Sequence, residues 1–111
     1  MELKITIERA QDVCVASVAG EIDVYTSPSL KMALVDAADD GCDVLVVDME
    51  GVDFIDSSGL GVLVGVLRRV KEVGGDMRLV CGRENVVKIF RITGLDKAFS
   101  IFATVDEARE V

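Results

Sequence analysis

The chain has 111 residues and a formal net charge of −8; half of its residues are apolar and 5% are aromatic, which allows one domain, residues 1–111, with an aliphatic core. It contains no histidine, and this excludes Ser-His-Asp and Cys-His nucleophile activation as well as zinc sites that need imidazole. Residues 1–56 carry 13 acidic and 3 basic side chains. This acidity disfavours nucleic acid as a partner and suits a basic protein partner, or simple solubility.

Residues 3–7 alternate aliphatic side chains with charged or polar ones, which predicts a half-buried strand at the edge of a sheet. Residues 13–18 are apolar on both faces, as in an inner strand, and the short connection favours antiparallel pairing of the two. Residues 20–25 are predicted to form a loop. Ser27 and Pro28 are typical of a helix N-cap followed by proline at the first helical position.

The second half of the chain continues to alternate strand and helix patterns. The predicted elements are a buried strand at 44–47, a helix at about 58–73, a strand at 77–81, a helix at 85–93, a short strand at 98–102 and a final helix from about Val105, capped by Thr104. The order β-β-α-β-α-β-α-β-α indicates an α/β fold with a mixed, mostly parallel sheet of about five strands and about four helices.

No apolar run approaches the roughly 20 residues that a membrane span needs, and the first residues lack the apolar core of a signal peptide. We therefore expect a soluble cytoplasmic protein. The three cysteines, Cys14, Cys42 and Cys81, are scattered through apolar segments, and no C-x-x-C pair occurs. Small buried thiols in a reducing compartment are favoured over a disulfide or a metal site.

Functional loops of such sheets gather at the carboxyl ends of the strands. Residues 20–25 and 50–58 follow neighbouring strands, so we expect these two loops to meet. The second loop ends on two serines, Ser57 and Ser58, one of which is expected to cap the following helix by accepting a backbone N–H. Only one cap is needed, which leaves the other hydroxyl free for chemistry.

Two further features of this helix start indicate a function beyond capping. Gly61 and Gly65 lie four residues apart on one helix face, which lets another backbone approach closely, from a neighbouring element or a partner protein. The surroundings are acidic, with Asp53 and Asp56 nearby and Asp23 expected on the facing loop, residues 20–25. A phosphoryl group on Ser57 would be stabilised by the helix N-terminus, but its added charge would repel a partner docked against the acids.

Three segments resemble the bacterial anti-sigma factor antagonists, which are single STAS domains. They are residues 20–23 (Gly-Glu-Ile-Asp), residues 52–63 with the core Asp-Ser-Ser-Gly-Leu-Gly, and residues 89–95 (Ile-Phe-Arg-Ile-Thr-Gly-Leu). They occur in the family's order and span nearly the whole chain. The resemblance implies a STAS-like sheet with strands in sequential order, in agreement with the element pattern above.

The resemblance also implies a partner switch in transcription regulation. The unphosphorylated protein would bind an anti-sigma factor that is also a serine kinase, and so release the sigma factor. The kinase would phosphorylate Ser57 and end the binding, and a metal-dependent serine phosphatase would reset the protein. The chain itself would be a monomer without enzymatic activity, cofactor or metal, because ATP and magnesium belong to the kinase.

Residue by residue, the resemblance assigns partner-binding roles around Ser57. Asp23 lies in the loop expected to face the nucleotide region of the kinase, and Asp56, Ser58 and Gly59 flank the phosphoacceptor. Gly61, on the glycine face of the helix, completes the candidate partner-binding set.

Three alternatives remain open at this point. A receiver domain phosphorylated on aspartate fits the length, but the early strands offer no acidic pair and Lys97 precedes the last predicted strand. An enzyme finds little support, since no Gly-x-Ser-x-Gly elbow or P-loop occurs. A STAS subunit of a larger stress-signalling or transport assembly would have the same fold but a different function.

Overall fold

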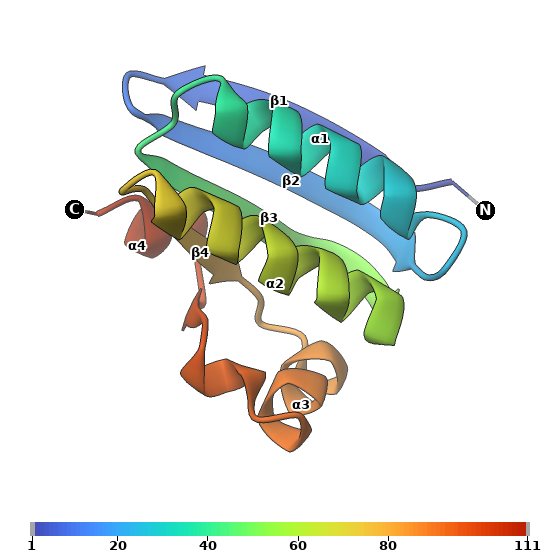
Figure 1. Cartoon of the computed structure of the whole chain (residues 1–111). Helices are drawn as coiled ribbons and strands as arrows, with labels where there is room; N and C mark the ends of the chain where they lie inside the picture. Colours follow the sequence, from blue (N-terminus) through green and yellow to red (C-terminus); the bar gives the residue numbers. More distant parts are fainter. Residues whose placement is uncertain (1, 111) are drawn as a thin grey trace.

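The computed structural model describes residues 2–110 and contains one five-stranded sheet with helices on both faces. The elements are β1 (Lys4–Ala10), β2 (Val13–Ile22), α1 (Ser27–Asp39), β3 (Val44–Ile55), α2 (Ser57–Glu72), β4 (Asp76–Val80), α3 (Glu84–Ile92), the short 3-10 helix η1 (Leu95–Lys97), β5 (Ser100–Phe102) and α4 (Val105–Arg109). The strands lie in sequential order across the sheet, β1-β2-β3-β4-β5 (Figure 1). This confirms the predicted α/β, STAS-like architecture.

Only the first strand pair is antiparallel, as predicted; every later neighbour in the sheet is parallel. Strands β2 and β3 are longer than predicted, because both continue to the loops at their carboxyl ends. The expected loop at residues 20–25 is therefore wrong over residues 20–22, and β3 passes through Gly51 instead of ending before it. Gly51 permits this pairing because a Cβ there would lie 2.8 Å from the Cβ of Ala19.

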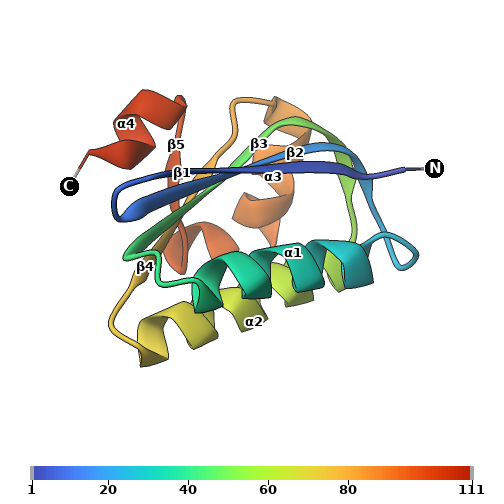
Figure 2. The ribbon, with the colours of Figure 1, turned by 90° about the horizontal axis from the view of Figure 1, so that it is seen from above.

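The main core lies between the sheet and helices α1 and α2, which run side by side over one face (Figures 1 and 2). It is mostly aliphatic, as the composition predicts, and it contains the edge-to-face pair Phe90 and Phe99, with ring centroids 5.9 Å apart. The short helix α4 covers a smaller apolar cluster on the opposite face of β3 and β4 (Figure 2). The carboxyl ends of β2 and β3 lie side by side at one end of the sheet, where α1 and α2 begin (Figure 1).

Helix α1 begins one residue earlier than predicted, and a different side chain lies at its start. Helix α1 begins at Ser27 with Thr26 as its N-cap, so the predicted Ser27 cap is wrong. The Thr26 hydroxyl instead donates to the Glu21 carbonyl oxygen at 2.8 Å and accepts from the Asp23 N–H at 2.9 Å. The predicted start of α4 is confirmed: Thr104 caps it and accepts from the Glu107 N–H.

The cysteine prediction is wrong for two of the three residues. Cys14 and Cys42 form a disulfide with their Cα atoms 5.8 Å apart, whereas Cys81 is a buried free thiol as expected. The two partners are 28 residues apart in sequence, but one lies near the start of β2 and the other just before β3. Parallel pairing of these strands brings their amino-terminal ends together, which no local pattern could reveal.

Among residues 2–110, no helix is both long enough and apolar enough to cross a membrane.

Candidate functional site

The carboxyl ends of β2 and β3 bring together the two segments that sequence patterns singled out. Strands β2 and β3 pair up to their last residues, Ile22 opposite Ile55. Immediately beyond, the Asp56 N–H donates to the Ile22 carbonyl oxygen at 3.1 Å. The expectation that these two loops meet is confirmed, and Asp23 and Asp56 each follow directly on one of the paired strands.

Helix α2 is capped by an acid, and not by either serine. The Asp56 Oδ1 accepts hydrogen bonds from the Ser58 N–H at 2.9 Å, the Gly59 N–H at 3.3 Å and the Ser58 hydroxyl at 2.5 Å. These bonds, led by the one from the Ser58 hydroxyl, hold the pKa of Asp56 below its usual value, with the N–H of Val24 also contributing. The predicted serine cap is wrong because aspartate is an equally good cap and lies one residue earlier.

This cap gives the two serines different environments. Ser57 is the first residue of α2 and is exposed, and no hydrogen bond engages its hydroxyl within the described residues. Ser58 is half-buried, with its hydroxyl committed to Asp56. Of the two, only Ser57 presents an accessible and uncommitted oxygen.

Asp23 organises the loop between β2 and α1. Its Oδ1 accepts from the Tyr25 N–H at 2.9 Å and from the Thr26 N–H at 3.0 Å, which closes a tight turn before α1. The side chain is half-buried, so Asp23 fixes the shape of this loop as well as contributing charge to it.

The glycines of α2 fall into two kinds. Gly59 is buried, and a Cβ there would lie 2.3 Å from the Cγ2 of Ile22 and 2.9 Å from the Cγ1 of Ile55. Gly61 and Gly65 face open space, because a Cβ at either position would have no neighbouring atom within 4 Å. Gly59 therefore lets the helix start pack onto the ends of both strands, whereas no neighbouring element explains Gly61 and Gly65.

The two exposed glycines line a groove of about 430 Å³ between α1 and α2. Ser58 lies at one end of this groove and Arg69 near the other. The groove's floor is partly apolar, with Val35 of α1 opposite Val62 and Val66 of α2. The glycines narrow the α2 wall, and the charged Lys31 and Arg69 also line the groove. A groove of this kind can accommodate a segment of another protein.

The acidic character of the site is weaker than the sequence suggests. The Asp53 carboxylate pairs with the Arg83 guanidinium at 2.8 Å, and the same guanidinium donates to the Glu50 carbonyl oxygen at 2.8 Å. The Asn85 amide adds a hydrogen bond to the Asp53 carbonyl oxygen. Asp53 thus ties the β3 end to the start of α3, leaving Asp56 and Asp23 as the acids next to Ser57.

Sequence reasoning missed three exposed apolar or aromatic side chains on the same two segments. Val24 is 62% exposed, Tyr25 is 87% exposed and Phe54 is 46% exposed. Val24 and Tyr25 are large residues in a short loop close to a candidate modification site, and this pattern could have been recognised in the sequence. Exposed aromatic and aliphatic groups of this kind are typical anchors of protein interfaces.

Comparison with known proteins identifies the family. The STAS domain profile matches residues 4–108. The chain belongs to the anti-sigma factor antagonists of the STAS domain family. It is 36% identical to the anti-sigma-B factor antagonist of Bacillus subtilis over 103 residues, which is 93% of this chain and 94% of that protein.

Solved structures agree with this assignment. An anti-sigma factor antagonist from Mycobacterium paratuberculosis superposes with a TM-score of 0.89 at 32% identity, covering 96% of this chain and 91% of that one. The Bacillus cell fate determinant SpoIIAA, solved in its phosphorylated form, superposes with a TM-score of 0.72 at 25% identity and covers 95% of this chain and 96% of that one. Membership in this family sets aside the receiver-domain alternative.

Proposed function

We propose that this protein is an anti-sigma factor antagonist whose binding is switched by phosphorylation of Ser57. In the unphosphorylated form it binds an anti-sigma factor that is also a serine kinase, and thereby frees the sigma factor. The kinase transfers phosphate to Ser57 and the complex dissociates, until a metal-dependent serine phosphatase removes the phosphate. The protein contributes a surface and an acceptor hydroxyl, and ATP and magnesium are bound by the kinase.

The observation that carries this proposal is the contrast between the two serines. The Ser57 hydroxyl is exposed and uncommitted, whereas the Ser58 hydroxyl is held by Asp56. The exposed Ser57 hydroxyl can enter a kinase active site directly, whereas the Ser58 hydroxyl would first have to give up its hydrogen bond to Asp56. The family resemblance independently assigns the phosphate to the first serine of the motif, and one relative has been solved in a phosphorylated form.

The electrostatics of the helix start support a switch of binding with little change in fold. A phosphate on Ser57 would lie at the positive end of the α2 dipole, close to backbone N–H groups that favour anions. It would add about −1.5 to −2 charges beside Asp56 and Asp23. The fold would tolerate this charge, while a partner that had docked against a surface of lower charge would be repelled.

The exposed apolar residues supply a contact surface for that partner. Val24 and Tyr25 lie in the loop after β2, Phe54 lies near the end of β3, and the groove with Gly61 extends from Ser58 along α2. Asp23 fixes the first loop, Asp56 fixes the helix start, and Gly59 lets α2 approach the strands. In this proposal the exposed side chains of Val24, Tyr25 and Phe54 form an apolar contact that polar groups surround, as in other protein interfaces.

Phosphorylation and binding are tested together with the purified cognate kinase. After incubation with ATP and magnesium, peptide mass spectrometry is expected to place a single phosphate on Ser57. Ser57→Ala is expected to bind the kinase constitutively, and Ser57→Asp is expected to bind at least tenfold more weakly than wild type.

Two control variants separate the site from its surroundings. Ser100→Asp adds the same charge at the exposed Ser100 of β5, at the sheet edge opposite β1, and is expected to bind like wild type. Ser58→Ala keeps the acceptor and is expected to be phosphorylated still. Phosphate on Ser58 or on an aspartate, or equal binding by Ser57→Ala and Ser57→Asp, would rule out the proposed switch.

A further inference from the structure

The Cys14–Cys42 disulfide lies at the end of the sheet away from Ser57. It joins the start of β2 to the connection between α1 and β3, at the left of Figure 1, whereas α2 begins at the right. The proposed switch makes no use of it. A crosslink here fastens the first hairpin and α1 to the central strand.

The two sulfurs differ in how a reagent could reach them. Cys14 is 1% exposed and lies within the core, between the sheet and the helices. Cys42 is 7% exposed and lines a surface hollow of about 580 Å³ near the C-terminal ends of α1 and α2. A small disulfide entering this hollow would meet Cys42 first, and Cys14 only through Cys42.

A reduced Cys42 would also find a hydrogen-bond partner. The Sγ of Cys42 lies 3.2 Å from the Ala37 carbonyl oxygen in the last turn of α1. A Cys42 thiol could therefore donate a hydrogen bond to that oxygen. The Cα separation of 5.8 Å lies within the range that disulfides require. The backbone thus holds the two cysteines at a separation that a disulfide can span.

We infer that Cys14 and Cys42 form a reversible thiol–disulfide couple, with Cys42 as the entry point and low-molecular-weight disulfides as the oxidant. The Cys42 thiolate attacks one sulfur of the small disulfide RSSR, forming a mixed disulfide Cys42–S–S–R and releasing one thiol RSH. The Cys14 thiolate then attacks the sulfur of Cys42 and releases the second RSH. Two electrons pass to RSSR, and the two thiol protons leave with the released thiols.

Oxidation is expected to stabilise the fold and leave the partner surface unchanged. A crosslink between residues 28 apart restricts the unfolded chain, whereas the native contacts around Ser57 lie at the other end of the sheet. Cys81 takes no part, because it is a lone buried thiol whose pKa is raised by burial. It supplies an internal control for reactivity.

The test uses oxidised glutathione and counts thiols by mass spectrometry after a denaturing quench. The wild-type protein is expected to lose two of its three thiols together, and its thermal midpoint is expected to rise by roughly 10 °C or more. Dithiothreitol is expected to reverse both changes. Loss of no thiol, loss of a single thiol, or crosslinking between molecules would overturn the inference, and this count needs no variant.

Single-cysteine variants test the order of attack. In a Cys81→Ala background, Cys14→Ala is expected to accumulate one glutathione on Cys42, and Cys42→Ala is expected to remain unmodified over the same time. Equal or faster modification of Cys14 would contradict Cys42 as the entry point.

Discussion

At the residue scale, Asp56 holds the start of α2 in place while Ser57 stays free. Three hydrogen bonds converge on one carboxylate oxygen, and two of them come from backbone N–H groups that would otherwise lack partners at the helix end. Ser57 can therefore gain or lose a phosphate without uncapping the helix. A serine cap would have coupled modification directly to helix stability.

The first prediction concerns this cap and its dependence on pH. Asp56→Ala is expected to lower the thermal midpoint by several degrees at pH 7. The pKa of Asp56 is lowered in the folded state, so its stabilising effect is fully present above the unfolded value of about 3.9 and is lost as the pH falls through the lower folded value. Thermal melts from pH 7 down to pH 2 should show the difference between wild type and variant shrinking below pH 4. A difference independent of pH would contradict the role of the charged carboxylate.

At the element scale, the glycines of α2 provide a matched pair of substitutions. Gly59→Ala places a methyl group against Ile22 and Ile55 and is expected to destabilise the fold by about 1–3 kcal/mol. Gly61→Ala meets no atom and is expected to stabilise it by about 0.5–1 kcal/mol, because alanine favours a helix interior. Urea unfolding measures both. Stabilisation by Gly59→Ala would contradict the close packing of α2 on the ends of β2 and β3.

The same pair tests the proposed partner groove. If a partner segment lies in the groove between α1 and α2, Gly61→Ala should weaken binding of the anti-sigma factor while raising stability. An exposed substitution outside the groove, Lys88→Ala on α3, serves as the control and is expected to leave binding unchanged. Unchanged binding by Gly61→Ala would remove this residue from the partner surface.

Strand and helix periodicity was sufficient to predict the order of elements, because aliphatic runs and amphipathic stripes are local features. It was not sufficient to predict where β2 and β3 end, since Gly20 and Gly51 look like breaks in a sequence. In the fold Gly51 instead allows close pairing of two strands. The Thr104 cap of α4 was predicted, but the cap of α2 was not, because Asp56, Ser57 and Ser58 are all acceptable caps and only the geometry chooses among them.

The candidate site was predictable in part for the same reason. The serine pair, the acids and Gly61 could be singled out from sequence, because residue type and spacing carry that signal. The pairing of Asp53 with Arg83 and the Cys14–Cys42 bond could not, because each joins residues about 30 positions apart through the sheet. The exposure of Tyr25 also depends on how the β2–α1 loop is folded by Asp23.

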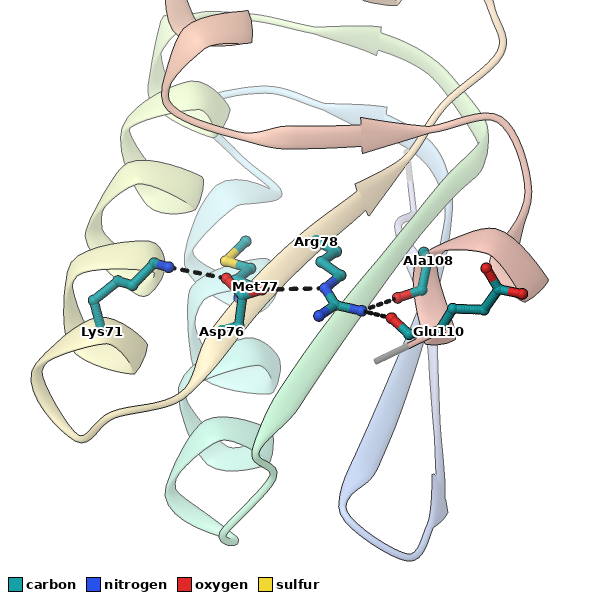
Figure 3. Close-up of polar contacts among 6 residues, drawn as sticks. All are labelled: Lys71, Asp76, Met77, Arg78, Ala108 and Glu110. Atoms are coloured by element: carbon teal, nitrogen blue, oxygen red, sulfur yellow. Dashed lines mark hydrogen bonds and ion pairs between the residues drawn. The ribbon is translucent and has the colours of Figure 1, made fainter.

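At the scale of the whole molecule, one arginine anchors the C-terminal helix by hydrogen bonds, in addition to the apolar cluster beneath that helix. The Arg78 guanidinium reaches from β4 to the Ala108 carbonyl oxygen at 2.8 Å and to that of Glu110, and it pairs with Asp76 at 3.1 Å (Figure 3). Asp76 is shared with Lys71 of α2. Although burial acts to raise the pKa of Asp76, hydrogen bonds from Lys71 and Arg78 hold it below its usual value.

Removing this anchor should loosen α4 before the rest of the fold. Arg78→Met keeps the aliphatic stem but loses the hydrogen bonds, and it is expected to cost about 1.5–3 kcal/mol of stability. Hydrogen exchange should accelerate at residues 105–109 and remain slow in β2 and β3. Binding of the partner should be retained, because α4 lies on the face of the sheet away from α1 and α2 (Figure 2). Uniform loss of protection across the sheet would instead show that α4 is part of one cooperative unit.

The phosphorylation switch is tested most directly by isothermal titration of the cognate anti-sigma factor with two forms of this protein, unmodified and stoichiometrically phosphorylated on Ser57. The proposed switch predicts tight binding of the unmodified form and at least a tenfold weaker affinity after phosphorylation, with far-ultraviolet circular dichroism unchanged. Equal affinity of the two forms, or stronger binding by the phosphorylated form, would contradict it.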